Sequence, residues 1–289
     1  MADNSPESNT YILDPESPTE LGRLINLDRF ITKSMGGPLA GLSETEIEKL
    51  HVVLDLACGP GSWVLDVAFA YPEAEVAGVD ISESMIAYAN ARARTQRRFN
   101  ASFGVMDITQ LLDFSDNSFD LINARFLVGV LYSDAWRRLI AECTRLLRPG
   151  GILRLTEPSD IDPETTTSEA FNSSHALFTQ AMCRAGYGFS SDGRAVNLMR
   201  TLPQLLQSAG YGNIQQVAYE IEIAQDTEVW ADYYRNFEVG GQMMQSFAVK
   251  TGMYTQEEVE KAYRQVLLDL LADDFRATQR YTTLWGTKL

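Results

Sequence analysis

The sequence predicts an α/β fold in which helices cover both faces of a mostly parallel β-sheet. Three observations carry this prediction. Short apolar runs typical of buried strands alternate with longer segments of helical periodicity, the first run (residues 52–57) breaks into a glycine turn, and aspartates stand at the ends of the next two strands. Because the carboxyl ends of parallel strands meet at one edge of a sheet, a ligand site is expected there.

Two elements are expected ahead of the first strand. Residues 1–16 are polar with scattered prolines and predict a loose arm, in which residues 11–13 form an apolar anchor able to fold back over a site. Ser17 and Glu20 form a capping-box signature, so a helix is predicted to begin there and to end at Gly36. The same signature begins a short second helix just before the first strand, at residues 43–46.

The segment 52–62 reads V-V-L-D-L-A-C-G-P-G-S. Gly59 and Gly61 allow backbone angles and a close ligand approach that a Cβ atom would block. Residues 62–71 continue with apolar side chains at helical spacing. A dinucleotide fingerprint requires a third small residue where this chain has Val64, which argues against binding of NAD or FAD.

Acidic residues end the next two strands. Asp80 lies about 20 positions after the glycine turn, where a carboxylate is placed to accept hydrogen bonds from both hydroxyls of a ribose. Ile81 and Met85 follow it and are expected to pack on the face of an adenine ring. Asp107 directly follows the third strand, so the two carboxylates are predicted to converge on one crevice.

Three segments carry a family resemblance. D-L-A-C-G-P-G-S resembles motif I of class I S-adenosylmethionine (SAM) methyltransferases, residues 116–126 resemble the fourth strand of that family, and L-R-P-G-G-I-L (147–153) resembles the motif before its fifth strand. The resemblance is strong over residues 50–157 and elsewhere extends only to the order of elements. It implies a Rossmann-like, seven-stranded, mostly parallel sheet of order 3-2-1-4-5-7-6, with an antiparallel last strand and helical cap insertions.

The resemblance also implies SAM as the cofactor and S-adenosylhomocysteine as its product. In the family pattern, Asp107 accepts from the adenine amine and the backbone N–H of Ile108 meets a ring nitrogen. Arg29 is a candidate for the cofactor carboxylate or a solvated helix residue, and Arg125 for cofactor, substrate or a salt bridge. The expected cofactor-binding residues are Asp55, Ala57, Cys58, Gly59, Gly61, Asp80, Ile81, Met85, Asp107, Ile108, Ala124, Arg125 and Arg29.

The remaining elements complete the predicted sheet and its cap. Residues 1–42 are expected to form an arm and a covering helix, and 43–289 the methyltransferase domain, with cap insertions at about 159–193 and 225–275. The later elements are expected as a helix over 133–147, a strand over 152–156, a helix over 195–209, a strand over 213–223 and a closing antiparallel strand over 280–288.

The acceptor is expected to be a small, mainly apolar or aromatic molecule that is methylated at O, N or C by in-line displacement. The chain resembles the methyltransferases of ubiquinone and menaquinone biosynthesis. Residues 123–126 read N-A-R-F instead of the N-P-P-Y or D-P-P-Y of DNA and glutamine N-methyltransferases, which argues against those substrates. His175 and Glu157 are the candidate bases. An aromatic cluster in the insertions, which includes two methionines, is expected to line an apolar pocket, the cap core or a dimer interface; its members are Tyr187, Phe189, Trp230, Tyr233, Tyr234, Phe237, Met243, Met244 and Phe247.

The amino-acid composition argues against nucleic acids and membranes as binding partners. The 289 residues carry a formal net charge of −15, which repels nucleic-acid phosphates and anionic membrane surfaces, so neither partner is expected. The three cysteines have no paired spacing, which predicts no disulfide framework and no metal site. The cysteine usage fits a reducing cytoplasm, and the polar N-terminus and the lack of a long apolar run argue against secretion and a membrane span. The protein is expected to be cytoplasmic and to be a monomer or homodimer.

Two other functions remain open at this point. The same motifs would serve a SAM-binding protein without methyl transfer, in which the cofactor is structural, is sensed, or takes part in a rearrangement. A dehydrogenase is the third interpretation, and Val64 argues against it.

Overall fold

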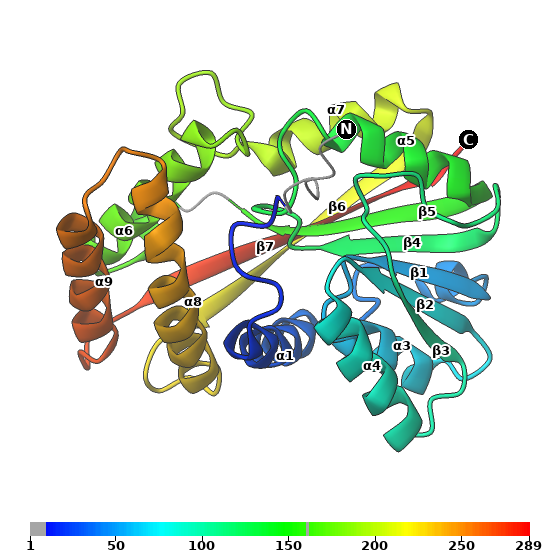
Figure 1. Ribbon diagram of the computed structural model, residues 1–289, viewed down its shortest axis with the longest axis horizontal. Helices are drawn as coiled ribbons and strands as arrows, with labels where there is room; N and C mark the ends of the chain where they lie inside the picture. Colours follow the sequence, from blue (N-terminus) through cyan, green and yellow to red (C-terminus); the bar gives the residue numbers. More distant parts are fainter. Residues whose placement is uncertain (1–9, 160–161) are drawn as a thin grey trace, which may run out of the picture.

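The computed structural model describes residues 10–159 and 162–289 and is built around a seven-stranded sheet of order β3-β2-β1-β4-β5-β7-β6 (Figure 1). β1 to β5 run parallel, and β7 is antiparallel to both of its neighbours. The predicted strand order is therefore confirmed. The strands are β1 (Val52–Leu56), β2 (Glu75–Asp80), β3 (Ala101–Val105), β4 (Phe119–Arg125), β5 (Leu147–Pro158), β6 (Tyr211–Ile223) and β7 (Ala277–Lys288).

Helices cover both faces of this sheet because its strands are apolar on both sides. In β1, Val53 packs into a core with residues of α3, whereas Leu54 and Leu56 pack into another core with residues of α5. Figure 1 shows α1, α3 and α4 below the sheet and α5 and α7 above it. The bounds are α1 (Pro18–Met35), α2 (Glu44–Ile47), α3 (Ser62–Ala70), α4 (Glu83–Thr95), α5 (Trp136–Leu146) and α7 (Leu198–Ser208).

Three further helices form a cap at one end of the molecule. They are α6 (Glu169–Arg184), α8 (Trp230–Lys250) and α9 (Gln256–Leu270), and a short 3-10 turn (Pro163–Thr165) precedes them. Figure 1 shows them grouped beside the end of β6 and the start of β7, and α8 also packs along α1. No helix within residues 10–159 and 162–289 has both the length and the apolar character that a membrane crossing requires.

The capping box predicted before the first strand is present, another capping box begins α9, and the one predicted at Ser17 is absent. Ser43 and Thr255 exchange both capping hydrogen bonds with the glutamates three residues later. The capping box predicted at Ser17 is wrong, because the side chain of Ser17 caps no backbone group. Glu20 is instead fully buried and accepts hydrogen bonds from Arg23 and Tyr11.

The part of the N-terminal arm that the structure describes is tied down at both ends. Residues 1–9 of the predicted loose arm lie outside the described residues. Farther along, the N–H of Ile12 donates to the carbonyl of Gly129 at 2.9 Å, on the loop after β4. The hydroxyl of Ser82, at the start of α4, donates to the carbonyl of Pro15 at 3.1 Å. The arm therefore bridges the loop after β4 and the start of α4.

Buried hydrogen bonds link the three central strands. The carboxylate of Asp55 in β1 accepts from the amide of Asn123 in β4 at 2.7 Å, and Arg154 in β5 donates to the oxygen of that amide at 2.6 Å. Arg154 also donates to the carbonyl of Ala40 at 2.9 Å. Burial raises the pKa of Asp55 to about 7 and lowers that of Arg154 to about 10. The three side chains therefore offset one another's cost of desolvation.

Arg154→Met is expected to destabilise the protein by about 3–5 kcal/mol, because it leaves Asp55 and Asn123 buried without the guanidinium. Urea denaturation measures this change in the free energy of unfolding. The matched control is Arg264→Met, which removes an exposed pair with Glu260 and should cost less than about 1 kcal/mol. Equal effects of the two substitutions would contradict the stabilising role of the buried hydrogen bonds among Asp55, Asn123 and Arg154.

Candidate functional site

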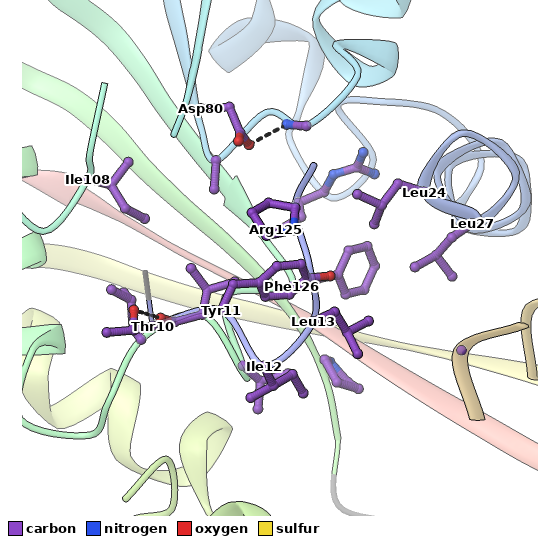
Figure 2. Close-up of a pocket in the computed structure, with 18 of the residues that line it drawn as sticks. Thr10, Tyr11, Ile12, Leu13, Leu24, Leu27, Asp80, Ile108, Arg125 and Phe126 are labelled. Atoms are coloured by element: carbon purple, nitrogen blue, oxygen red, sulfur yellow. Dashed lines mark hydrogen bonds between the residues drawn. The ribbon is translucent and has the colours of Figure 1, made fainter. Parts of the chain in front are cut away.

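A cavity of about 920 Å³ lies where β1, β2, β3 and β4 end. This volume is near the top of the range of about 300–1,000 Å³ for small-molecule sites. One half of its wall, the strand-end half, consists of the loops after these strands. The other half, the cap half, consists of α1, α6, α8 and β7. Figure 2 shows the arm passing across it, with Tyr11 and Leu13 among the lining residues.

One carboxylate organises the strand-end half of the cavity. Asp80 accepts the backbone N–H of Gly59 at 2.8 Å (Figure 2) and that of Ser82 at 3.0 Å, so it joins the turn after β1 to the start of α4. Burial raises the pKa of Asp80, and the two backbone N–H groups partly oppose that shift. A rigid acceptor thus stands beside a glycine turn.

The two glycines of this turn have different roles. Both have positive φ angles, 51° at Gly59 and 75° at Gly61. Gly59 lines the cavity, and a Cβ there would meet no atom closer than Leu24, at 3.6 Å. A Cβ at Gly61 would lie 2.5 Å from the ring of Phe103 and 2.8 Å from Ala89. Gly61 is therefore required for helix and strand packing, and it does not line the cavity.

Asp107 gives the strand-end half a second carboxylate. Its Oδ1 accepts the backbone N–H and the hydroxyl of Thr109, both at 2.8 Å, and these bonds fix its orientation. Ile81, Met85 and Ile108 add apolar surface to the same wall. The arrangement offers two separated acceptors with an apolar surface between them, as a nucleoside requires.

The α1 wall carries two charged pairs. Arg125, at the end of β4, forms an ion pair with Asp28 and donates to the hydroxyl of Thr32 at 3.1 Å. Arg23 binds Glu20 through two hydrogen bonds of 2.7 and 2.6 Å. Burial lowers the pKa of Arg125 to about 9.

The structure does not bring every predicted residue to this cavity. Arg29 is 65% exposed in its side chain and pairs with Asp232 of α8 at 3.1 Å, because it lies on the outer side of α1. Ala124 is fully buried within the sheet. The predicted residues that do line the cavity are Asp55, Ala57, Cys58, Gly59, Asp80, Ile81, Met85, Asp107, Ile108, Arg125 and His175.

Glu157 is also placed away from the cavity wall. It is fully buried, and its two oxygens accept the backbone N–H groups of Leu127 at 2.7 Å and Val128 at 3.1 Å. Burial raises its pKa to about 8, although both N–H groups act in the opposite direction. The carboxyl group therefore anchors the loop after β4 rather than facing a ligand.

His175 lines the cap half of the cavity from α6. Its ring centroid lies 4.5 Å from that of Phe171, and its Nε2 atom is buried without a hydrogen-bond partner. Burial lowers the pKa of His175 to about 4, so the ring is neutral near pH 7. A neutral imidazole at this position presents a polar atom to an otherwise apolar wall.

Much of the cap half was not predicted from the sequence. Of the predicted aromatic cluster, Tyr233, Phe237 and Met244 line the cavity, whereas Trp230 and Tyr234 pack against each other in the cap core. The lining residues that the sequence analysis did not single out include Arg23, Leu24, Leu27, Asp28, Phe126, Phe178, Asn236, Gln279 and Tyr281.

A helical phase analysis of α1 would have found four of these residues. Arg23, Leu24, Leu27 and Asp28 share one side of the helix, and Arg29 falls outside it. No local pattern identifies Gln279 and Tyr281, because β7 reaches the cavity only through long-range pairing with β5 and β6.

Comparison with known proteins identifies the type of domain. Residues 53–151 match the family model described as "Methyltransferase domain". A demethylmenaquinone methyltransferase of Lactococcus lactis is 30% identical over 135 residues, which cover 46% of this chain and 49% of the relative. The N-methyltransferase verN of Clonostachys rogersoniana is 28% identical over 151 residues, with coverages of 52% and 50%. The chain thus spans about half the length of the curated relatives it matches.

A solved structure shares the fold. Phosphoethanolamine N-methyltransferase 2 of Haemonchus contortus, in complex with S-adenosyl-L-methionine, superposes with a TM-score of 0.50 at 18% identity. The match covers 92% of this chain and 52% of that one. At this identity the similarity establishes a common Rossmann-like architecture.

Glu157→Gln is expected to flatten the dependence of stability on pH. Because burial raises the pKa of Glu157 from 4.5 to about 8, the folded protein keeps a proton that the unfolded chain releases as the pH rises. The wild-type free energy of unfolding should therefore fall between pH 5 and pH 8, and the substitution should remove about 3 kcal/mol of that fall. Urea denaturation at both pH values measures it.

The exposed Glu257, replaced by Gln in the same way, should leave this pH dependence unchanged. If Glu157→Gln had the same pH dependence as the wild type, Glu157 would have to be ionised throughout this range.

Proposed function

The chain carries a methyltransferase domain of the SAM-dependent, Rossmann-like type, and on this premise we propose that it transfers a methyl group from SAM to a small, mainly apolar or aromatic molecule. One observation carries the proposal. The strand-end half of the cavity, with Gly59, Asp80 and Asp107, is continuous with a cap half lined by Phe178, Phe237 and other apolar side chains. The proposed cofactor site and the proposed acceptor site are thus two halves of one cavity.

The residues of the strand-end half fit the cofactor. Asp80 and Asp107 supply separate acceptors, suited to the ribose hydroxyls and the adenine amine. Ile81 and Ile108 supply apolar surface for the adenine ring. Gly59 leaves the adjoining wall free of a side chain, with a positive φ that other residues rarely adopt. These features support SAM over a dinucleotide, which would need a small residue at Val64.

The chain's own residues contribute mainly positioning and exclusion of water. When bound, SAM supplies a methyl group on a positively charged sulfur. Helices α6 and α8 would hold the acceptor against the strand ends, and the arm from Thr10 to Glu16 would cover both molecules. Alignment of reacting groups can lower a barrier by about 7–11 kcal/mol, more than a general base contributes.

Neither of the two predicted bases, His175 and Glu157, is well placed to act as a strong base. Glu157 is bound to two backbone N–H groups, and a pKa of about 4 makes His175 a weak proton acceptor near pH 7. We infer that the acceptor either loses its proton readily or is methylated at an atom that carries none.

Calorimetry on the purified protein is expected to detect binding of SAM and of S-adenosylhomocysteine. Incubation with methyl-labelled SAM and a panel of hydroxylated, amino-substituted and quinol aromatics should then yield labelled product from at least one acceptor. Lack of binding to either form of the cofactor would refute the proposal. Binding without S-adenosylhomocysteine formation across the panel would favour a SAM-binding protein that does not transfer the methyl group.

Asp107→Ala is expected to weaken S-adenosylhomocysteine binding about tenfold or more, since a hydrogen bond to a charged group contributes about 1.5–3 kcal/mol. Titration calorimetry measures the change in Kd. Asp113→Ala is the matched control, because Asp113 is exposed and does not line the cavity. The assignment of Asp107 would not survive equal affinities for the two variants.

A further inference from the structure

The charged side chains that line the cavity bear on the charge of the acceptor, and this inference rests on the proposed function. Arg23 is held by Glu20, and Arg125 is held by Asp28. Both arginines line the cavity with their charges already paired within the wall. The other charged lining residues within residues 10–159 and 162–289 are Asp55, Asp80 and Asp107 at the strand ends, and the exposed Asp134 and Arg138.

The remaining polar groups of the cap half are neutral. Burial raises the pKa of Tyr233 and of Tyr281 far above neutrality, so both hydroxyls keep their protons. Asn236, Gln279 and Thr179 carry no charge at any pH. An anionic acceptor would therefore lose its hydration and meet no unpaired cation among the side chains of the cap half, which is costly in a buried site.

Within residues 10–159 and 162–289, two buried polar atoms of the lining residues lack a hydrogen-bond partner: Nε2 of His175, and Oδ2 of Asp28, whose carboxylate pairs with Arg125 through Oδ1. Nε2 of His175 is buried and makes no hydrogen bond, whereas a buried polar atom is normally paired. His175 lines the cavity, and its ring packs on Phe171, which in turn contacts Tyr233 and Phe237. The imidazole is thus held in an aromatic cluster that forms part of the cavity wall.

We propose that the acceptor is an uncharged aromatic molecule that presents a hydroxyl group to Nε2 of His175. A hydroxyl fits either tautomer of the neutral ring, because it both donates and accepts a hydrogen bond. His175 then selects and orients the acceptor, and a molecule of the same shape without the hydroxyl leaves Nε2 buried and unpaired. Sites built around such a hydrogen bond discriminate strongly against analogues that lack it.

Binding of three naphthalene probes tests this inference, with and without saturating S-adenosylhomocysteine. The probes are 1-naphthol, naphthalene and 1-naphthoate, and calorimetry gives the Kd of each. We expect 1-naphthol to bind roughly tenfold or more tightly than naphthalene, because an unpaired buried group is costly. 1-Naphthoate should bind more weakly than 1-naphthol.

A second readout follows His175 directly. The chain has only two histidines, so the ¹⁵N spectrum of histidine-labelled protein contains two imidazoles, and the His51→Phe variant identifies them. 1-Naphthol should shift the Nε2 resonance of His175 and leave that of the exposed His51 unchanged. Naphthalene should move neither nitrogen by a comparable amount.

The His175→Phe variant keeps an aromatic ring without the nitrogen. In this variant the Kd of naphthalene divided by that of 1-naphthol should fall to about one. His51→Phe should retain the wild-type preference. A wild-type protein without that preference, an unmoved His175 resonance, tighter binding of 1-naphthoate, or no binding of any probe would each overturn the inference. Failure to bind S-adenosylhomocysteine would count against the proposed function alone, since the probe titrations are also made without it.

Discussion

The hydrogen bonds from Asp55 through Asn123 to Arg154 tie the three central strands together, and the cavity depends on the register that they stabilise. These residues lie opposite one another in the β1–β4 and β4–β5 pairs. A slip of one residue would turn every side chain of a strand to the other face. Asp55 would then leave the cavity wall, and the turn that carries Gly59 would no longer meet Asp80.

The fold and the strand-end half of the site were largely predictable because their signals are local. A buried strand, a glycine turn and a helix follow one another within residues 52–71, and parallel strands bring their ends to one edge. Asp80 and Asp107 therefore reach the same cavity although 26 residues of sequence separate them. The division of the chain at residue 42 and its oligomeric state stay predictions.

The rest of the site depends on partners that are distant in sequence. Glu20 fits a capping box locally, but Tyr11 and Arg23 offer it stronger, buried hydrogen bonds. Glu157 was predicted as a candidate base, and the backbone N–H groups after β4 hold its carboxyl group away from the cavity. Tertiary packing alone determines which cap side chains line the cavity, so their spacing in the sequence carries no signal for it.

The arm from Thr10 to Glu16 adds a kinetic consequence. It lines the cavity and is bound by a few hydrogen bonds to the loop after β4 and to the start of α4, with further bonds from Tyr11 to Glu20 and from Tyr187 to the carbonyl of Thr10. Segments held in this way open locally at a small fraction of the free energy of global unfolding. For any molecule that passes beneath the arm, the frequency of this opening sets an upper bound on turnover, however fast the chemical step.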